Sequence, residues 1–226
     1  MRRWYIAGVL LAVVGLLAFS YWVVQAGYQQ PYPYGPGGGI GPGMSGPRMM
    51  GGGLGNQDPN LKPLTIDQAA DAVRGYVDAY EGELVLTEVM DFAWNYYAEV
   101  EEEDTGIHAM ELLIDKYTGR VYPEMGPNMM WNTKYGHMAG MMGRRYGTPT
   151  ANMPIGPEQA KAIAQQYLDT NLPGLTVADA DTFYGYHTLH TLKNGQVEGM
   201  LSVNGYSGAV WYHGWHGPFI DMKEFE

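Results

Sequence analysis

The sequence predicts an α+β protein: two tandem modules, each one helix plus a three- or four-stranded antiparallel sheet, after an N-terminal transmembrane helix. Three observations support this. They are an apolar stretch at the start, an internal repeat with an offset of about 90 residues, and the same order of helix and hairpin signals in both copies. The expected boundaries are 1–26 for the anchor or signal peptide, 27–60 for a tether, 61–127 for the first module, 128–153 for a Met/Gly-rich crossover, and 154–226 for the second module.

Residues 4–24 are uncharged and mostly apolar, and as a helix they extend about 31 Å, enough to cross a hydrocarbon core of about 30 Å. Arg2 and Arg3 precede this stretch, which predicts a cytoplasmic N-terminus and an extracytoplasmic remainder. Val24-Gln25-Ala26 also suits cleavage of a signal peptide. We therefore expect a single-pass membrane protein or, as the alternative, a secreted or periplasmic one.

Residues 27–60 are rich in Gly, Pro, Tyr and Met, carry almost no charge and show neither a helical nor a strand period. A segment of this composition buries too little apolar surface to offset the entropy of ordering. It is predicted to be a disordered tether.

The repeat sets the order of elements in the modules. Residues 68–78 recur at 159–169, and residues 114–122 recur at 203–211. Thr65 and Gln68 have the spacing of a capping box, and Pro157 suits the first position of a helix, so each copy is predicted to open with a helix.

Strands are predicted to follow each helix, because the segments after it are rich in β-branched and aromatic residues and are separated by turn residues. Asn194-Gly195 is a strong hairpin signal, and Asp115 with Gly119 suits a tight turn. The predicted strands are 84–92, 94–101, 107–115 and 120–122 in the first copy, and 184–192 and 197–203 in the second.

Tyr97-Ala98-Glu99-Val100 on a strand and the segment 114–121 at the last turn resemble the PepSY family. The resemblance covers residues 64–123 and, more weakly, 154–212, where Asn204 and Ser207 replace the aspartate and threonine of the first copy. It implies a non-catalytic module that binds or restrains another protein, such as a peptidase or a sensor. It transfers no catalytic residue.

Composition excludes several functions. The net charge of −11 and the lack of a basic stripe argue against nucleic acid as a partner. The absence of cysteine removes disulfides, thiolate metal sites and thiol nucleophiles. No known catalytic motif is present, so we do not expect an enzyme. An uncharacterised hydrolase is kept as the third functional hypothesis.

Methionine and histidine give a candidate copper site in the crossover, because thioether and imidazole together suit Cu(I). Its residues are His137, Met138, Met141 and Met142. Packing of methionine is the alternative explanation. His213 and His216 form a second candidate metal site, whereas His187 and His190 should point to opposite faces of a strand. The acidic run 99–104 is interpreted as a solvated strand edge.

These observations give two main functional hypotheses. The first is a membrane-tethered extracytoplasmic binding or regulatory protein that acts on a protein partner. The alternative is an extracytoplasmic copper-handling protein that uses Met and His ligands.

Overall fold

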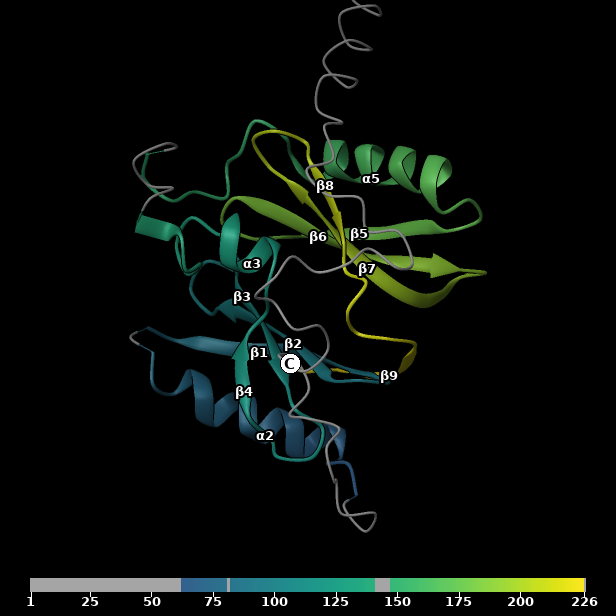
Figure 1. Cartoon of the computed structure of the whole chain (residues 1–226). Helices are drawn as coiled ribbons and strands as arrows, with labels where there is room; N and C mark the ends of the chain where they lie inside the picture. Colours follow the sequence, from purple (N-terminus) through teal and green to yellow (C-terminus); the bar gives the residue numbers. More distant parts are fainter. Residues whose placement is uncertain (1–61, 81, 141–146, 226) are drawn as a thin grey trace, which may run out of the picture.

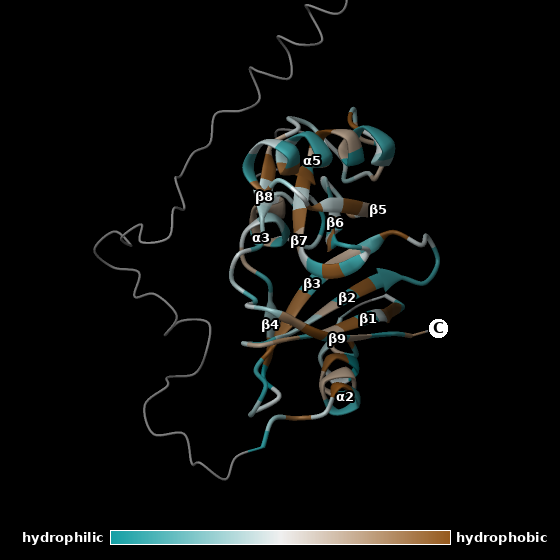
Figure 2. Ribbon diagram, turned by 90° about the vertical axis from the view of Figure 1, so that its right-hand side faces the viewer, coloured by the Kyte–Doolittle hydropathy of each residue, from teal (hydrophilic) through white to brown (hydrophobic). Residues whose placement is uncertain are grey.

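The computed structural model describes residues 62–80, 82–140 and 147–225, and these form four layers (Figure 1). One helix lies on the outside of each of two antiparallel sheets, and the two sheets face each other between the helices (Figure 2). The predicted α+β class is confirmed. The predicted anchor and tether lie outside the described residues, and within those residues we find no helix of the length and apolarity that a membrane crossing requires.

Each module contains one helix and a four-stranded meander in the same order. The first module comprises α2 (Ile66–Val77), β1 (Leu84–Phe92), β2 (Tyr96–Glu102), β3 (His108–Ile114) and β4 (Val121–Pro123). The second comprises α5 (Pro157–Asn171), β5 (Thr176–Thr182), β6 (Tyr186–Lys193), β7 (Gln196–Asn204) and β8 (Val210–Tyr212). Strand β5 was not among the predicted strands, because its alternating Asp and Ala residues give a weak strand signal.

The last strand, β9 (Phe219–Glu224), pairs with β1 of the first module. The first sheet therefore has five strands in the order β4-β3-β2-β1-β9, more than the three or four predicted, and the second has four in the order β5-β6-β7-β8, as predicted. The end of the predicted second module, 154–226, thus contributes to the first sheet. This pairing depends on where the chain emerges after β8, and no local signal in the sequence specifies that position.

Each helix packs its apolar face on the outer face of its own sheet. The predicted capping box is present: the Gln68 N–H donates to the Thr65 hydroxyl oxygen (3.2 Å), and the Thr65 N–H donates to the Gln68 side chain (2.9 Å). Behind α2, Val73 belongs to one apolar cluster with Ala98 and Leu112 of the sheet, and behind α5 an equivalent cluster includes Leu168. Each module therefore has its own apolar core.

The turns after β3 and β7 show the duplication at atomic detail. The Asp115 side chain accepts hydrogen bonds from the backbone and hydroxyl of Thr118 (2.8 and 2.9 Å). Asn204 accepts the same pair of bonds from Ser207 (2.9 and 3.0 Å). Gly119 and Gly208 follow with φ of 68° and 71°, a conformation that glycine tolerates best. The predicted structural role of this turn is confirmed.

The crossover packs against both modules. In it, α3 (Pro127–Met130) lies between the two sheets (Figure 1). Asn132 donates to the Ala109 carbonyl (2.7 Å) in the first module, and the Thr133 N–H donates to the Tyr184 carbonyl (2.8 Å) in the second. Lys134 pairs with the buried Glu102 (2.5 Å). This part of the crossover therefore holds the modules together.

We predict that Gly185→Ala destabilises the protein much more than Gly195→Ala. Both glycines have positive φ, 112° and 80°, so alanine is strained at either position. Only at Gly185 would the added Cβ meet a crossover backbone atom, the Trp131 carbonyl oxygen, at 2.2 Å. We expect a loss of about 1 kcal/mol for Gly195→Ala and about 3 kcal/mol or more for Gly185→Ala, measured by urea unfolding. Equal losses would show that the crossover does not pack as described.

Candidate metal centre

One buried carboxylate and two buried histidines meet where the two modules join. Glu124 follows β4, and its N–H donates to the Glu111 carbonyl on β3 (2.9 Å). His213 follows β8 directly, and His216 lies in the loop that leads to β9. Exposed fractions of 0%, 3% and 1% for Glu124, His213 and His216 show that all three are removed from solvent.

The polar atoms of these residues point into one small volume. Glu124 Oε1 lies 3.0 Å from His216 Nε2, and Glu124 Oε2 lies 3.5 Å from His213 Nδ1. One ligand atom from each residue falls within 4.8 Å of the others. Although the contacts are short, Glu124 Oε2 and the two ring nitrogens have no aligned hydrogen-bond partner within the described residues. Ligand atoms around a metal ion have this arrangement, since each points at the ion rather than at its neighbours.

The opposite nitrogen of each ring is held by another side chain. His216 Nδ1 lies 3.0 Å from the Asn95 side-chain oxygen, which can only accept, so the ring proton belongs on Nδ1 and the Nε2 lone pair faces Glu124. Metal-bound histidines are oriented in this way by a second group behind the ring.

A chain of hydroxyl groups orients His213 similarly. The Thr188 hydroxyl donates to Glu111 Oε1 (2.7 Å), and in this arrangement the Ser202 hydroxyl donates to Thr188 (2.9 Å). Ser202 is then left to accept from His213 Nε2 (2.9 Å), which directs the Nδ1 lone pair toward Glu124. Three acceptor atoms thus face one another, an arrangement that a bound cation would stabilise.

The charge state of Glu124 suits a metal ligand. Burial alone would raise the pKa of this carboxyl group, but in the metal-free protein the positive charge that His213 and His216 carry when protonated outweighs burial and lowers the pKa to about 2. A bound cation would take the place of that charge and leave both rings neutral. Burial lowers the pKa of His216 despite the nearby Glu124. At neutral pH the carboxylate is therefore ionised, as metal binding requires.

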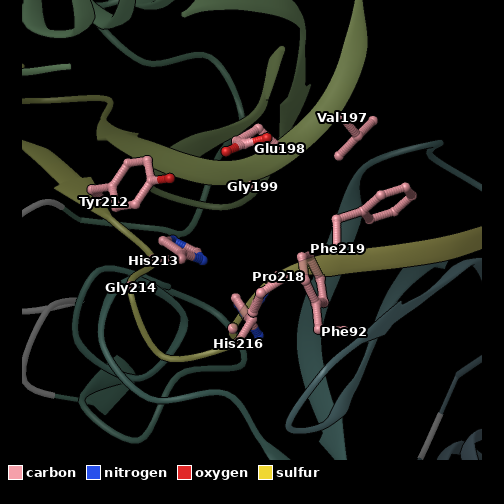
Figure 3. Close-up of a pocket in the computed structure, with 11 residues that line it drawn as sticks. Phe92, Val197, Glu198, Gly199, Tyr212, His213, Gly214, His216, Pro218 and Phe219 are labelled. Atoms are coloured by element: carbon pink, nitrogen blue, oxygen red, sulfur yellow. The ribbon is translucent and has the colours of Figure 1, made fainter. Parts of the chain in front are cut away.

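A cavity of about 330 Å³ lies beside the cluster. Figure 3 shows His213 and His216 along it, between Tyr212 on one side and Phe92 with Phe219 on the other. The cavity gives a route by which an ion or a further ligand could reach the two rings.

The other predicted candidates behave differently. His137 is exposed and Met138 is half-buried in the crossover, while Met141 and Met142 lie outside the described residues. His187 contacts Thr182 (3.1 Å) and the Ile155 carbonyl (2.9 Å), whereas His190 faces Glu88 across the sheets. The prediction that His187 and His190 occupy opposite faces is confirmed.

The interpretation of residues 99–104 as a solvated edge was wrong for two of them. Glu99 is 2% exposed and Glu102 is 4% exposed, because the second sheet and the crossover cover them. Glu102 accepts hydrogen bonds from Tyr135 (2.6 Å) and Tyr184 (2.7 Å) in addition to its Lys134 contact. The alternation of Tyr97 with Glu99 was the available signal, since alternate strand residues share a face.

Glu111 is a fully buried acidic group between the sheets. Three hydroxyl groups lie within hydrogen-bond distance of its carboxyl oxygens, those of Tyr97 (2.9 Å), Tyr186 (2.9 Å) and Thr188 (2.7 Å). Burial raises its pKa well above the usual range, and the negative charges of Glu124 and Glu99 add to this effect. The carboxyl group therefore holds its proton to higher pH in the folded protein than in the unfolded chain.

Comparison with models of protein families, with curated proteins and with solved structures finds no match for this chain. The resemblance to PepSY modules therefore stays a prediction from the residues quoted above.

We predict that Glu111→Gln makes the protein more stable at pH 8 and has little effect at pH 4.5. Because the folded pKa is raised, the unfolded chain loses this proton first, above about pH 4.3, and stability falls as the pH rises further. Glutamine keeps the shape and removes this loss. We expect the thermal midpoint at pH 8 to rise by about 3 °C or more.

The matched control is Glu103→Gln, which neutralises an exposed carboxylate and should change the midpoint little at either pH. A Glu111→Gln midpoint below that of the natural protein at pH 8 would contradict a proton held on Glu111.

Proposed function

We propose that this protein binds a transition-metal ion on the extracytoplasmic side of a membrane and that Glu124, His213 and His216 hold the ion. The supporting observation is that three buried acceptor atoms from these residues lie within 4.8 Å of one another, while Asn95 and Ser202 hold the outer nitrogens of the rings. The membrane anchor and the extracytoplasmic location rest on the apolar stretch 4–24 and its flanking arginines.

The donor set indicates which ions fit. Two imidazole nitrogens and one carboxylate oxygen suit Zn²⁺ and Cu²⁺, whereas thioether sulfur suits Cu(I). Glu124, His213 and His216 themselves supply nitrogen and oxygen atoms and no sulfur. Copper handling is therefore proposed with Cu²⁺ at Glu124, His213 and His216, and Cu(I) binding by the crossover methionines is a separate hypothesis.

We predict that one equivalent of Cu²⁺ added to the full chain in detergent gives an electron paramagnetic resonance spectrum with coupling to two imidazole nitrogens. His216→Gln should reduce this to one nitrogen and weaken binding by at least about tenfold, and Ser202→Ala should weaken it by roughly tenfold through loss of ring orientation.

His187→Gln is the matched control, because His187 is equally buried but lies on the other face of β6. It should leave the Cu²⁺ spectrum unchanged. The combined replacement of His137, Met138, Met141 and Met142 by serine and alanine should also leave it unchanged. A spectrum that survives in His216→Gln but disappears in the combined variant would move the copper site to the crossover.

Binding of a protein partner is the second candidate function, and the exposure of large apolar side chains beside the metal centre favours it. Trp94 is 65% exposed and Ile220 is 57% exposed. The Trp94 backbone N–H donates to the His216 carbonyl (3.1 Å), and a Cβ added at Gly217 would lie 3.0 Å from the Trp94 ring, so the loop that carries His216 contacts both the backbone and the ring of Trp94. A partner that contacts Trp94 could therefore detect whether the site is loaded.

We predict that a photo-crosslinking residue at position 94 of the membrane-bound chain captures a partner more strongly when Cu²⁺ is present. The same residue at Tyr117, which is 37% exposed in the β3–β4 turn, serves as the control. Equal capture at both positions, with or without copper, would argue against a partner surface at Trp94.

A further inference from the structure

We propose a second metal site, formed by Glu88 and Glu99 of the first sheet and His190 of the second, which holds one divalent cation between the two modules. It is separate from the Glu124 site and does not depend on it. Its ligand set is richer in oxygen, with two carboxylates and one imidazole.

The three side chains converge from three strands. Glu88 lies on β1, Glu99 on β2 and His190 on β6, and one ligand atom from each falls within 4.8 Å of the others. Glu88 is 8% exposed and Glu99 is 2% exposed. Glu88 Oε1 and His190 Nε2 are 3.3 Å apart, yet both are buried without an aligned hydrogen-bond partner among the described residues. These atoms therefore lie close together without a hydrogen bond between them, which leaves them available to a common ligand.

The surrounding groups position Glu99 and balance its charge. Tyr97 donates to Glu99 Oε1 (2.6 Å). His108 Nδ1 lies 3.0 Å from Glu99 Oε2, and its Nε2 lies 3.7 Å from Asp181 and 3.9 Å from Glu101. Since both of its nitrogens face carboxylates, we assign His108 as a charged imidazolium that neutralises this side of the cluster rather than as a ligand.

A plain ion pair between His190 and Glu88 would leave the cluster negative. Glu88, Glu99 and Asp181 face His108 and His190, and Glu101 and Glu224 line the same cavity. Even with both histidines protonated, five carboxylates exceed two imidazoliums. When a divalent cation replaces the proton of His190, the net charge of the same seven groups changes from −3 to −2. The three ligands together with their ion then carry no net charge, which is the state that burial favours.

An ion can reach the site from solvent. A cavity of about 260 Å³ opens at two of the three ligands, Glu88 and Glu99, and its other lining residues include Thr87, His108 and Phe225. This space can hold the waters that would complete the coordination of an ion with three protein ligands.

The duplication explains why a carboxylate and a histidine meet here. In the strand register, Tyr96 pairs with Ile114, and His187 pairs with Val203 in the second copy. Glu99 lies three residues after Tyr96, and His190 lies three residues after His187. Glu99 and His190 therefore occupy equivalent positions on the inner faces of the two sheets. Once the copies pack face to face, the equivalent positions lie near each other and carry complementary ligands.

The experiment uses the full chain in detergent with His213→Gln and His216→Gln both present, so that its outcome is independent of the first site. Mn²⁺ is the probe, because it accepts oxygen-rich ligand sets. Free Mn²⁺ is counted by electron paramagnetic resonance, and the thermal midpoint is recorded with and without the ion. We expect one Mn²⁺ per chain and a higher midpoint, because the ion binds groups from both sheets only in the folded protein.

Adding Glu99→Gln or His190→Gln to this background should weaken Mn²⁺ binding by at least about tenfold and remove the rise in midpoint. His108→Gln is the matched control and should retain one Mn²⁺ per chain. Circular dichroism of the metal-free variants checks the fold, and His190→Gln provides the test if Glu99→Gln does not fold.

Three results would overturn the proposal. The first is that the background protein binds no stoichiometric Mn²⁺ at free concentrations up to roughly 1 mM. The second is that the affinity is unchanged in the folded Glu99→Gln or His190→Gln variant. The third is that His108→Gln abolishes binding as completely as His190→Gln, which would place the ion between Glu99, His108 and Asp181 instead.

Discussion

The packing of the two modules depends on satisfying one buried carboxyl group, that of Glu111. This group lies on the inner face of the first sheet, fully buried, and receives hydroxyl groups from Tyr97 in its own module and from Tyr186 and Thr188 in the other. A buried polar group without a partner costs about 1–3 kcal/mol, and more if it is charged. The first module therefore needs hydroxyl groups of the second module to satisfy the hydrogen bonds of Glu111. This requirement favours the observed orientation of the two sheets over other orientations that would bury the same apolar area.

The two kinds of interface in the molecule differ in their chemistry. Between each helix and its sheet the contacts are apolar, whereas the inner faces of the sheets share only a small apolar cluster around Met90, Leu113 and Met200. Around that cluster, carboxylates of the first module meet histidines and hydroxyl groups of the second: Glu88 with His190, and Glu124 with His213. Each module can therefore form a core with its own helix, but the join between them depends on polar geometry and protonation.

Much of the fold could be predicted from local signals. The capping box at Thr65, the hairpin at Asn194-Gly195 and the repeated Asp115 and Asn204 turns all appear as expected, since each depends on residues close in sequence. The pairing of β9 with β1 could not be predicted, because it joins segments about 130 residues apart.

The candidate site was predicted only in part, because some of its residues lie far apart in the sequence. His213 and His216 are three residues apart and were recognised together, but Glu124 reaches them only through the packing of the two modules. Glu99 was misassigned because an acidic run is usually solvated, and the second sheet that covers it lies about 80 residues further along the chain.

The two proposed ion sites lie within one hydrogen-bonded layer. From Glu124 the contacts run through His213, Ser202 and Thr188 to Glu111, and from there through Tyr97 to Glu99. Each proposed site takes ligands from both modules, so an ion at either site favours the packed arrangement over a separated one. A ligand that stabilises a shared arrangement must also favour the binding of a second ligand to that arrangement. If the modules can separate, an ion at one site therefore strengthens ion binding at the other site, because both sites need the packed arrangement. Neither module has to change its own structure for this coupling.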